Sequence, residues 1–334
     1  MKTYPLEPLA WYGSSYYDYP DPEPVPSPTQ EPDALARPDW KSDSKAKRGL
    51  VCGRFLPVHR GHQLLIDFAR ARCKKLVIAV HAAPGDGISQ AQRVAWLREL
   101  YPGCEVIRDT RFGAIDLVFS SDPIHAQLAG ELGARLVLCD PERKLVPISG
   151  TQVRQAPLLH WRYLPECVRP FFLKVVRVVG PEGSGKTSLC ERLAHRFDTC
   201  YVPEYALSLA SANAGLLKKD QLAEWAMQHL AARQALERVA NRVLFLDTDL
   251  VTVAHWGERL YGEAPPWIRK RQQHYDLTLI LEPVLEGLNE QQQRERRQMY
   301  EKWDGVEGVR LGGTWAEREA QAIAALSSRW SELL

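Results

Sequence analysis

Short apolar runs alternate with amphipathic stretches along the chain from residue 49 onward. In the first half, apolar runs predict strands at Leu50–Gly53, Leu76–His81, Cys104–Ile107, Asp116–Ser120 and Arg135–Cys139. The amphipathic stretches between them predict helices at Gly61–Cys73, Ser89–Leu100 and Ile124–Leu132. Strand–helix alternation of this kind is typical of a parallel sheet with helices on both faces.

A second series of the same kind starts near Lys174. Its apolar runs predict strands at Val175–Val179, Arg242–Leu246, Leu277–Leu281 and Val306–Leu311. Helices are predicted at Lys186–Phe197 and Asp220–Ala240, and Thr314 and Glu317 form a capping box that opens a helix to Leu333. We find no internal repeat, so the two series predict two different α/β domains.

The first 48 residues differ from the rest. They hold nine of the 23 prolines and five of the 12 tyrosines, without apolar periodicity. Proline removes backbone donors, so this composition predicts a disordered tail, with a short aromatic docking motif at residues 11–19 as the alternative. The proline-containing stretch 155–173 predicts the join between the domains, which gives a tail at 1–48 and domains at 49–172 and 173–334.

Composition narrows the classes of function. The chain has 334 residues, a net charge of +2 and interspersed acids and bases, whereas a nucleic-acid binder usually concentrates basic residues. We therefore expect no DNA binding. No apolar run is long enough to cross a bilayer and no signal core is present, so we expect a cytoplasmic protein. The seven cysteines contain no Cys-x-x-Cys pair, which favours reduced thiols.

The first candidate site lies where the first predicted strand meets the first helix. The stretch runs Gly53-Arg54-Phe55-Leu-Pro-Val-His59-Arg-Gly61-His62. Glycine lets a ligand approach the backbone, and a helix N-terminus offers free N–H groups to an anion. Two histidines beside such a turn add donors for phosphate oxygens, so we predict a nucleotide-phosphate site here.

A second phrase points to the same phosphates. Ser149, Thr151 and Arg154 open a later predicted helix within the stretch Ile-Ser-Gly-Thr-Gln-Val-Arg. Serine or threonine there could simply cap the helix. Together with the histidines, a second phosphate-facing helix start is the better interpretation, in which Arg154 stabilises charge on a leaving pyrophosphate.

A P-loop carries the second site. The residues Gly180-Pro-Glu182-Gly183-Ser184-Gly185-Lys186-Thr187-Ser188 match Gly-x-x-x-x-Gly-Lys-[Ser/Thr] between a predicted strand and a predicted helix. In this motif backbone N–H groups cradle the phosphates, the lysine reaches the β- and γ-oxygens and the threonine binds Mg²⁺. We predict ATP as a co-substrate and Mg²⁺ as its metal.

Acidic residues end later apolar runs. Asp247 and Asp249 follow a predicted strand and could hold the Mg²⁺ or position the acceptor hydroxyl, and Glu204 is a second potential base. A surface carboxylate is the alternative for Glu204. The charged stretch 286–297 is either a solvated helix face or a lid with candidate arginines Arg294, Arg296 and Arg297.

The histidine motif and the Ile-Ser-x-Thr-x-x-Arg phrase resemble the nucleotidyltransferase superfamily. By that resemblance His59, His62, Thr151 and Arg154 bind the triphosphate, and His62 makes the main transition-state contact. Followed by a P-loop, and with the phrases Asp140-Pro-Glu-Arg-Lys and Asp247-Thr-Asp, the chain resembles the NadR-type bifunctional family from about residue 50 to its end.

That resemblance implies a Rossmann-like adenylyltransferase domain followed by a P-loop kinase domain. The kinase would phosphorylate nicotinamide riboside, and the transferase would convert nicotinamide mononucleotide to NAD. Three departures are present: residues 1–49 cannot form a helix-turn-helix, the stretch 93–120 is short, and no Arg-Glu pair follows Glu204-Tyr. These departures keep open a degenerate or differently specific transferase, or a nucleotide-responsive regulator. The sequence does not indicate an oligomeric state, so an oligomer is possible.

Overall fold

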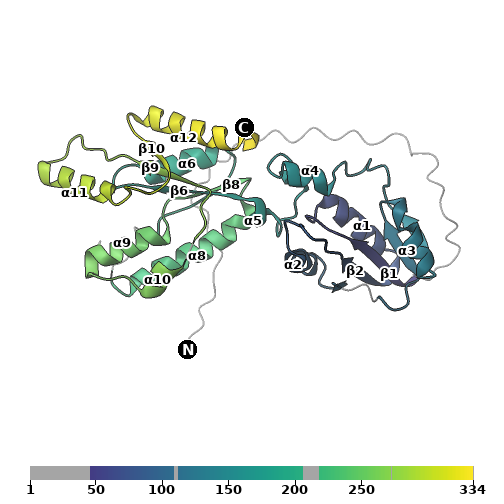
Figure 1. Cartoon of the computed structure of the whole chain (residues 1–334). Helices are drawn as coiled ribbons and strands as arrows, with labels where there is room; N and C mark the ends of the chain where they lie inside the picture. Colours follow the sequence, from purple (N-terminus) through teal and green to yellow (C-terminus); the bar gives the residue numbers. More distant parts are fainter. Residues whose placement is uncertain (1–45, 109–111, 206–217, 272, 334) are drawn as a thin grey trace, which may run out of the picture. The chain divides into compact units, whose positions relative to one another are not determined.

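The computed structural model describes residues 46–108, 112–205, 218–271 and 273–333 (Figure 1). The predicted tail up to residue 45, including its aromatic motif, lies outside the described residues. Strand β1 (Ala46–Gly53) begins four residues before its predicted start, so residues 46–48 belong to the first strand. Each of the two predicted domains contains its own five-stranded sheet.

The first sheet is entirely parallel, with the order β3-β2-β1-β4-β5. Its other strands are β2 (Cys73–Val80), β3 (Glu105–Ile107), β4 (Leu117–Ser120) and β5 (Arg135–Leu138). The strand order reverses between β1 and β4, and ligands of open α/β sheets bind at the carboxyl ends of strands at such a switch point. The predicted phosphate turn directly follows β1 at this point.

Helices cover both faces of this sheet. They are α1 (Arg60–Arg70), α2 (Gln90–Leu100), α3 (Ala126–Glu131) and α4 (Gly150–Gln155). Alternate residues of β1 point to opposite faces, so Val51 joins the cluster of Ile66 on α1 while Leu50 joins that of Ala129 on α3. Both faces being buried explains why these strands are continuous apolar runs.

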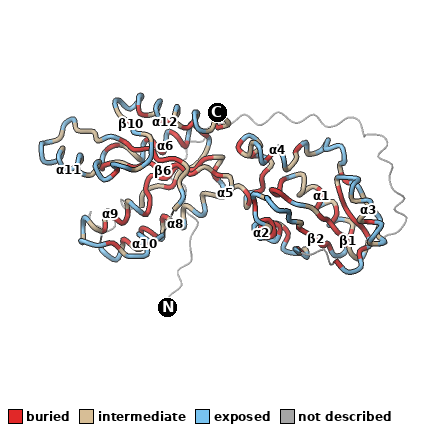
Figure 2. The backbone as a smooth tube through the Cα atoms, in the orientation of Figure 1, coloured by how far each residue is buried: buried red, intermediate tan, exposed pale blue. Residues whose placement is uncertain are grey.

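The second sheet is also parallel, with the order β10-β9-β6-β8-β7. The strands are β6 (Lys174–Val179), β7 (Tyr201–Val202), β8 (Val243–Leu246), β9 (Leu277–Leu281) and β10 (Val309–Leu311). The central strand β6 leads into the P-loop, with β8 on one side and β9 on the other. Figure 2 shows the central strands of both sheets as the buried part of each domain.

Six helices of the second domain surround this sheet in the described residues. They are α6 (Lys186–Arg196), α8 (Gln221–Val239), α9 (Leu250–Tyr261), α10 (Pro266–Lys270), α11 (Glu290–Glu301) and α12 (Trp315–Arg329). Figure 1 shows α6 and α12 on one side of the sheet, with α9 and α10 on the other. The join holds α5 (Arg169–Phe172) and a 3-10 turn at Trp161–Tyr163.

The structure confirms the predicted parallel α/β class and corrects several boundaries. Cys73, predicted to end the first helix, instead starts β2, because α1 ends at Arg70. The helix predicted at Ile124–Leu132 begins with a 3-10 turn, Pro123–His125, and the last predicted strand shortens to Val309–Leu311. The Thr314–Glu317 capping box is present, but its helix ends at Arg329.

None of the helices in the described residues combines the length and the apolar character needed to cross a bilayer.

Candidate functional site

The turn after β1 places the two motif histidines at the start of α1. Phe55 is fully buried and has φ +48°, a left-handed conformation that reverses the chain after the strand. His59 is the N-cap of α1, and its backbone N–H donates to Nδ1 of His62 over 3.3 Å. The two imidazole rings stack with their centroids 3.7 Å apart.

Both histidines are neutral at physiological pH. Burial, followed by the nearby Arg143 cation, lowers the pKa of His59 to about 4. Burial also holds the pKa of His62 well below its usual value, with further contributions from His59 and Arg143. Nδ1 of His59 is buried and has no hydrogen-bond partner among the described residues. With its proton on Nδ1, the neutral imidazole would donate this N–H to a phosphate oxygen, and the phosphate charge would raise both pKa values.

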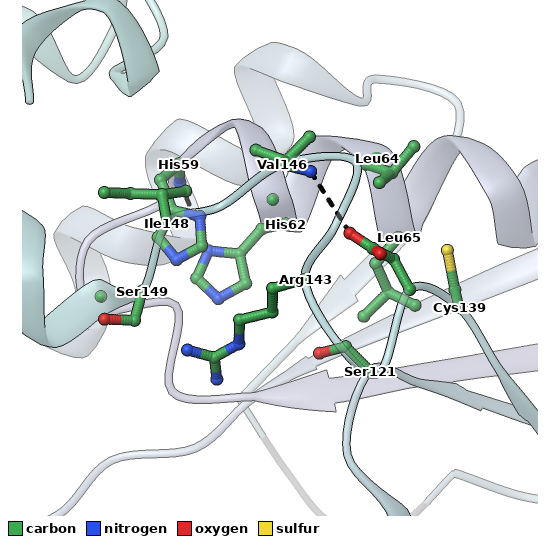
Figure 3. Close-up of a pocket in the computed structure, with 13 residues that line it drawn as sticks. His59, His62, Leu64, Leu65, Ser121, Cys139, Arg143, Val146, Ile148 and Ser149 are labelled. Carbon is green, nitrogen blue, oxygen red and sulfur yellow. Dashed lines mark hydrogen bonds between the residues drawn. The ribbon is translucent and has the colours of Figure 1, made fainter.

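A small cavity of about 120 Å³ opens beside these rings. Figure 3 shows His62 and Arg143 projecting into the same space, with Ser149 at one side and Ser121 at the other. The Arg143 loop is shaped by Asp140, whose Oδ1 accepts the backbone N–H of Lys144 over 2.8 Å. Arg143 was not predicted as a site residue, although it lies in the phrase Asp140-Pro-Glu-Arg-Lys.

Helix α4 supplies the other wall, as predicted. Ser149 is its N-cap and accepts the N–H of Gln152 over 3.3 Å. Arg154 donates to the Leu56 carbonyl oxygen over 2.5 Å and to Thr151 Oγ1 over 3.0 Å. These contacts tie the α4 helix start to the histidine turn, and Arg154 itself remains exposed.

A second cavity of about 360 Å³ shares its lining with the first. Its walls are Arg54, Phe55, Leu56, His62, Arg143, Ser149, Gly150, Thr151 and Arg154. Arg54 pairs with Asp86, whose other oxygen binds the fully buried Arg93 over 2.9 Å. Apart from Gly53, the structure therefore gathers the predicted residues of the first site around one space, which is lined by three arginines and by the neutral imidazoles.

The P-loop follows β6 in the geometry that its motif requires. Gly180, Gly183 and Gly185 all have positive φ, at 150°, 69° and 87°, and Gly185 is the N-cap of α6. Ser184 is fully buried, whereas Glu182, Thr187 and Ser188 are exposed. The Lys186 ammonium donates to the Pro181 carbonyl oxygen over 3.1 Å. It therefore lies over the loop in which the phosphates would bind.

The predicted acidic residues separate into two groups. Oδ2 of Asp247 accepts the Thr187 hydroxyl over 2.6 Å, so the carboxyl end of β8 meets the P-loop. Burial raises the pKa of Glu204 to about 7, against the opposing effect of Lys186, and raises that of Asp247 to about 6. These two carboxyl groups and Lys186 therefore lie within electrostatic range of one another.

Asp249 points elsewhere. Its Oδ2 binds Arg177 over 2.7 Å, and its Oδ1 caps α9 by accepting the N–H of Thr252 over 2.7 Å. Both carboxylate oxygens of Asp249 therefore have partners within the protein, and these contacts explain its burial without a metal. A metal-binding role for Asp249 stays a prediction that this geometry does not favour.

The three candidate lid arginines lie on α11. Arg296 reaches the P-loop, because a Cβ added to Gly183 would lie 2.6 Å from its Nη2 atom. Its Nη1 donates to the Val284 carbonyl oxygen over 2.8 Å. Among the described residues the side chains of Arg294 and Arg297 form no hydrogen bond, so of the three arginines only Arg296 is placed at the site by a contact.

Replacing Gly185 with alanine is expected to disable the second site. The new Cβ would lie 1.6 Å from Cη2 of Trp315, at a φ that L-residues avoid. A P-loop displaced by about 1 Å should lower the kcat/KM of any phosphate transfer at this site by at least about tenfold. Steady-state kinetics would measure this, with Gly262→Ala as the matched control, because Gly262 has φ +75° but open space around it. Equal losses in both variants would contradict the steric explanation.

Comparison with known proteins gives the same two-part division. The cytidylyltransferase-like family model matches residues 50–139, and an AAA domain model matches residues 175–332. The trifunctional NAD biosynthesis/regulator protein NadR of Escherichia coli is 28% identical over 280 residues, covering 70% of this chain and 68% of the relative. Nicotinamide-nucleotide adenylyltransferase of Methanocorpusculum labreanum is 28% identical over 157 residues, covering 40% and 90%.

Solved structures show the same fold. A crystal structure of NadR protein in complex with NR has a TM-score of 0.68 at 22% identity, covering 86% of this chain and 97% of the other. A second, of NadR protein with NAD and AMP-PNP, has a TM-score of 0.67 at 22% identity, covering 86% and 98%.

Proposed function

We propose that this chain, a NadR-type protein, is a bifunctional enzyme of NAD synthesis. Its P-loop domain, residues 173–334, phosphorylates nicotinamide riboside with ATP. Its transferase domain, residues 49–172, joins AMP from a second ATP to the resulting mononucleotide. The observation that carries the proposal is that one chain holds two separate phosphate cradles, each between the central strand of a parallel sheet and the helix that follows it.

In the transferase domain, a mononucleotide phosphate oxygen attacks the α-phosphorus of ATP, and the bond to the β-phosphate breaks to release pyrophosphate. The residues proposed to bind the triphosphate are Gly53, Arg54, Phe55, His59, Gly61, His62, Ser149, Thr151 and Arg154. The imidazoles act as neutral N–H donors, while Arg154 and Arg143 supply the positive charge that the leaving pyrophosphate needs. Catalysis of this type rests on positioning and charge stabilisation.

In the kinase domain, the riboside 5′-oxygen attacks the γ-phosphorus of ATP, and ADP leaves. Backbone N–H groups of residues 180–188 hold the phosphates, and Lys186 turns from the Pro181 carbonyl to their oxygens. A pKa near 7 suits Glu204 as the base that takes the hydroxyl proton. Asp247 is the alternative base, but its bond to Thr187 suits it better to the metal shell.

The residues at the P-loop fit Mg²⁺. Oδ1 of Asp247 is buried and unpartnered among the described residues, and the Thr187 hydroxyl oxygen lies 2.6 Å from its Oδ2. These hard oxygen donors suit a cation that keeps several waters and binds through phosphates with one or two protein ligands. When bound, Mg²⁺ would neutralise charge on the β- and γ-phosphates.

Kinase activity should rise with pH through the pKa of its base. Burial raises the pKa of Glu204 to about 7, so the carboxylate that accepts the proton is lost below that pH and complete above it. We expect kcat/KM for the riboside to increase about tenfold per pH unit below the pKa and to level off above about pH 8. A pH–rate profile would measure this. A Glu204→Gln variant with unchanged activity and an unchanged profile would assign the base to Asp247.

The proposed activities are tested by product analysis. Purified protein with Mg²⁺ and ATP receives either nicotinamide riboside or nicotinamide mononucleotide, and products are separated by chromatography. We expect mononucleotide and then NAD from the riboside, and NAD from the mononucleotide. Mononucleotide without NAD would indicate a degenerate or differently specific transferase. No turnover of either substrate would contradict the proposal and favour a nucleotide-responsive regulator.

A further inference from the structure

Trp315 lies on the P-loop without being part of it. It is the first residue of α12, and the Cη2 edge of its indole points at Gly185, where an added Cβ would lie 1.6 Å from Cη2 and within 2.6 Å of the two neighbouring ring carbons. About half of the residue, 48%, is nevertheless exposed. An exposed tryptophan fixed against a phosphate loop is a large flat apolar surface beside a polar ligand site.

The tryptophan is held in place by a buried arginine one turn along α12. Arg318 is 5% exposed, and its Nη1 donates to the Ser184 carbonyl oxygen over 3.3 Å and to the Glu282 carbonyl oxygen over 2.9 Å. Its Nε donates to the Gly313 carbonyl oxygen over 2.9 Å, directly before the helix cap. One side chain thus joins the loops that follow β6, β9 and β10, and it fixes the start of α12 relative to the P-loop.

The strand order places Trp315 on the side opposite the acceptor. Asp247 and Glu204 follow β8 and β7, which lie on one side of β6, and Trp315 follows β10 on the other side. A nucleotide bound in the P-loop directs its γ-phosphate toward the acceptor groups. In that orientation the base is at the other end of the nucleotide, on the side of β9, β10 and the start of α12.

We propose that Trp315 is the stacking platform for the purine base of ATP in the kinase domain. The inference rests on the proposed function for the identity of the nucleotide, but the position of the indole is independent of the acceptor. A face of the indole binds the base, Gly185 abuts the Cη2 edge of the ring, and Arg318, whose guanidinium carbon lies 5.9 Å from the ring centroid, is a positioning residue that holds the helix start. Aromatic stacking tolerates any purine, so the platform contributes affinity more than it selects adenine.

The test compares Trp315→Ala and Trp315→Phe with Trp267→Ala, a control on α10 that removes a tryptophan of similar exposure, 37%. The KM for ATP in riboside phosphorylation, counted as mononucleotide plus NAD, should rise about tenfold in Trp315→Ala. Trp315→Phe keeps an aromatic face and should stay within about threefold of the parent. Inhibition by tripolyphosphate, which has no base, should be equal in all variants.

A second measurement does not depend on the acceptor. The chain has ten tryptophans, so the signal of Trp315 is the fluorescence change on adding Mg·ADP minus the change in Trp315→Phe. We expect quenching with ADP and none with tripolyphosphate. Quenching without riboside phosphorylation would contradict the proposed kinase acceptor while supporting the platform. The platform would be overturned by an unchanged KM for ATP in Trp315→Ala. It would also be overturned if inhibition by tripolyphosphate weakened as much as ATP binding in that variant, or if no quenching occurred.

Discussion

Replacing Lys186 with alanine is expected to abolish riboside phosphorylation while leaving NAD formation from the mononucleotide intact. The ammonium lies in the P-loop, bound to the Pro181 carbonyl, and is the cation that would reach the β- and γ-phosphates. Removing a preorganised charge from a phosphoryl-transfer site typically costs two to three orders of magnitude, so kcat should fall by about 10²–10³-fold. Separate assays with riboside and with mononucleotide would measure both activities.

A matched control for this variant is Lys270→Ala, which removes an exposed lysine of α10 in the same domain. Both activities should remain near those of the parent protein. Loss of NAD formation in Lys186→Ala would contradict the assignment of separate ATP sites, because the P-loop would then serve both reactions.

Replacing His62 with alanine should have the complementary effect. His62 lines both cavities of the first site and stacks on His59. Its loss removes one donor to phosphate and also the ring that holds the His59 imidazole in place. We expect NAD formation from the mononucleotide to fall by about 10²-fold or more, with kinase activity unchanged. The control is His160→Ala, a partly buried histidine of the joining segment. Retained transferase activity in His62→Ala would mean that another residue makes the main transition-state contact.

The first site also predicts how ligand binding changes the imidazoles. Burial and Arg143 keep both rings neutral, so the free protein gains no charge there as pH falls through 6.5. A bound triphosphate favours the protonated form and offsets the Arg143 cation, which raises both pKa values by linkage. The tightness of ATP binding in this domain should therefore increase toward lower pH.

Much of the fold was predictable because the signals are local. The turn after β1 and the P-loop each combine glycine, a helix start and phosphate-binding side chains within about ten residues. The capping residues Ser89 and Thr314 likewise mark helices that the structure contains. Continuous apolar runs predicted the central strands because parallel strands are buried on both faces.

Other features depend on tertiary contacts that a single sequence does not contain. Helix α9 follows β8 almost directly and begins with apolar and β-branched residues, so the sequence did not predict a separate helix there. Only its N-cap, Asp249, indicates a helix start. That same residue was predicted as a metal ligand because the sequence could not show its pairing with Arg177, 72 positions away. Arg143 lies on a loop and Trp315 at the start of α12, each distant in sequence from the motif that it approaches, which explains why neither was predicted.

That two phosphate-transfer sites act in sequence within one chain is tested most directly by the phosphate balance of the complete reaction. Starting from nicotinamide riboside, each NAD formed should be accompanied by one ADP from the kinase step and one pyrophosphate from the transferase step. Pyrophosphate should disappear in His62→Ala while ADP persists, and both should disappear in Lys186→Ala. ADP without pyrophosphate or NAD in the parent protein would contradict the claim.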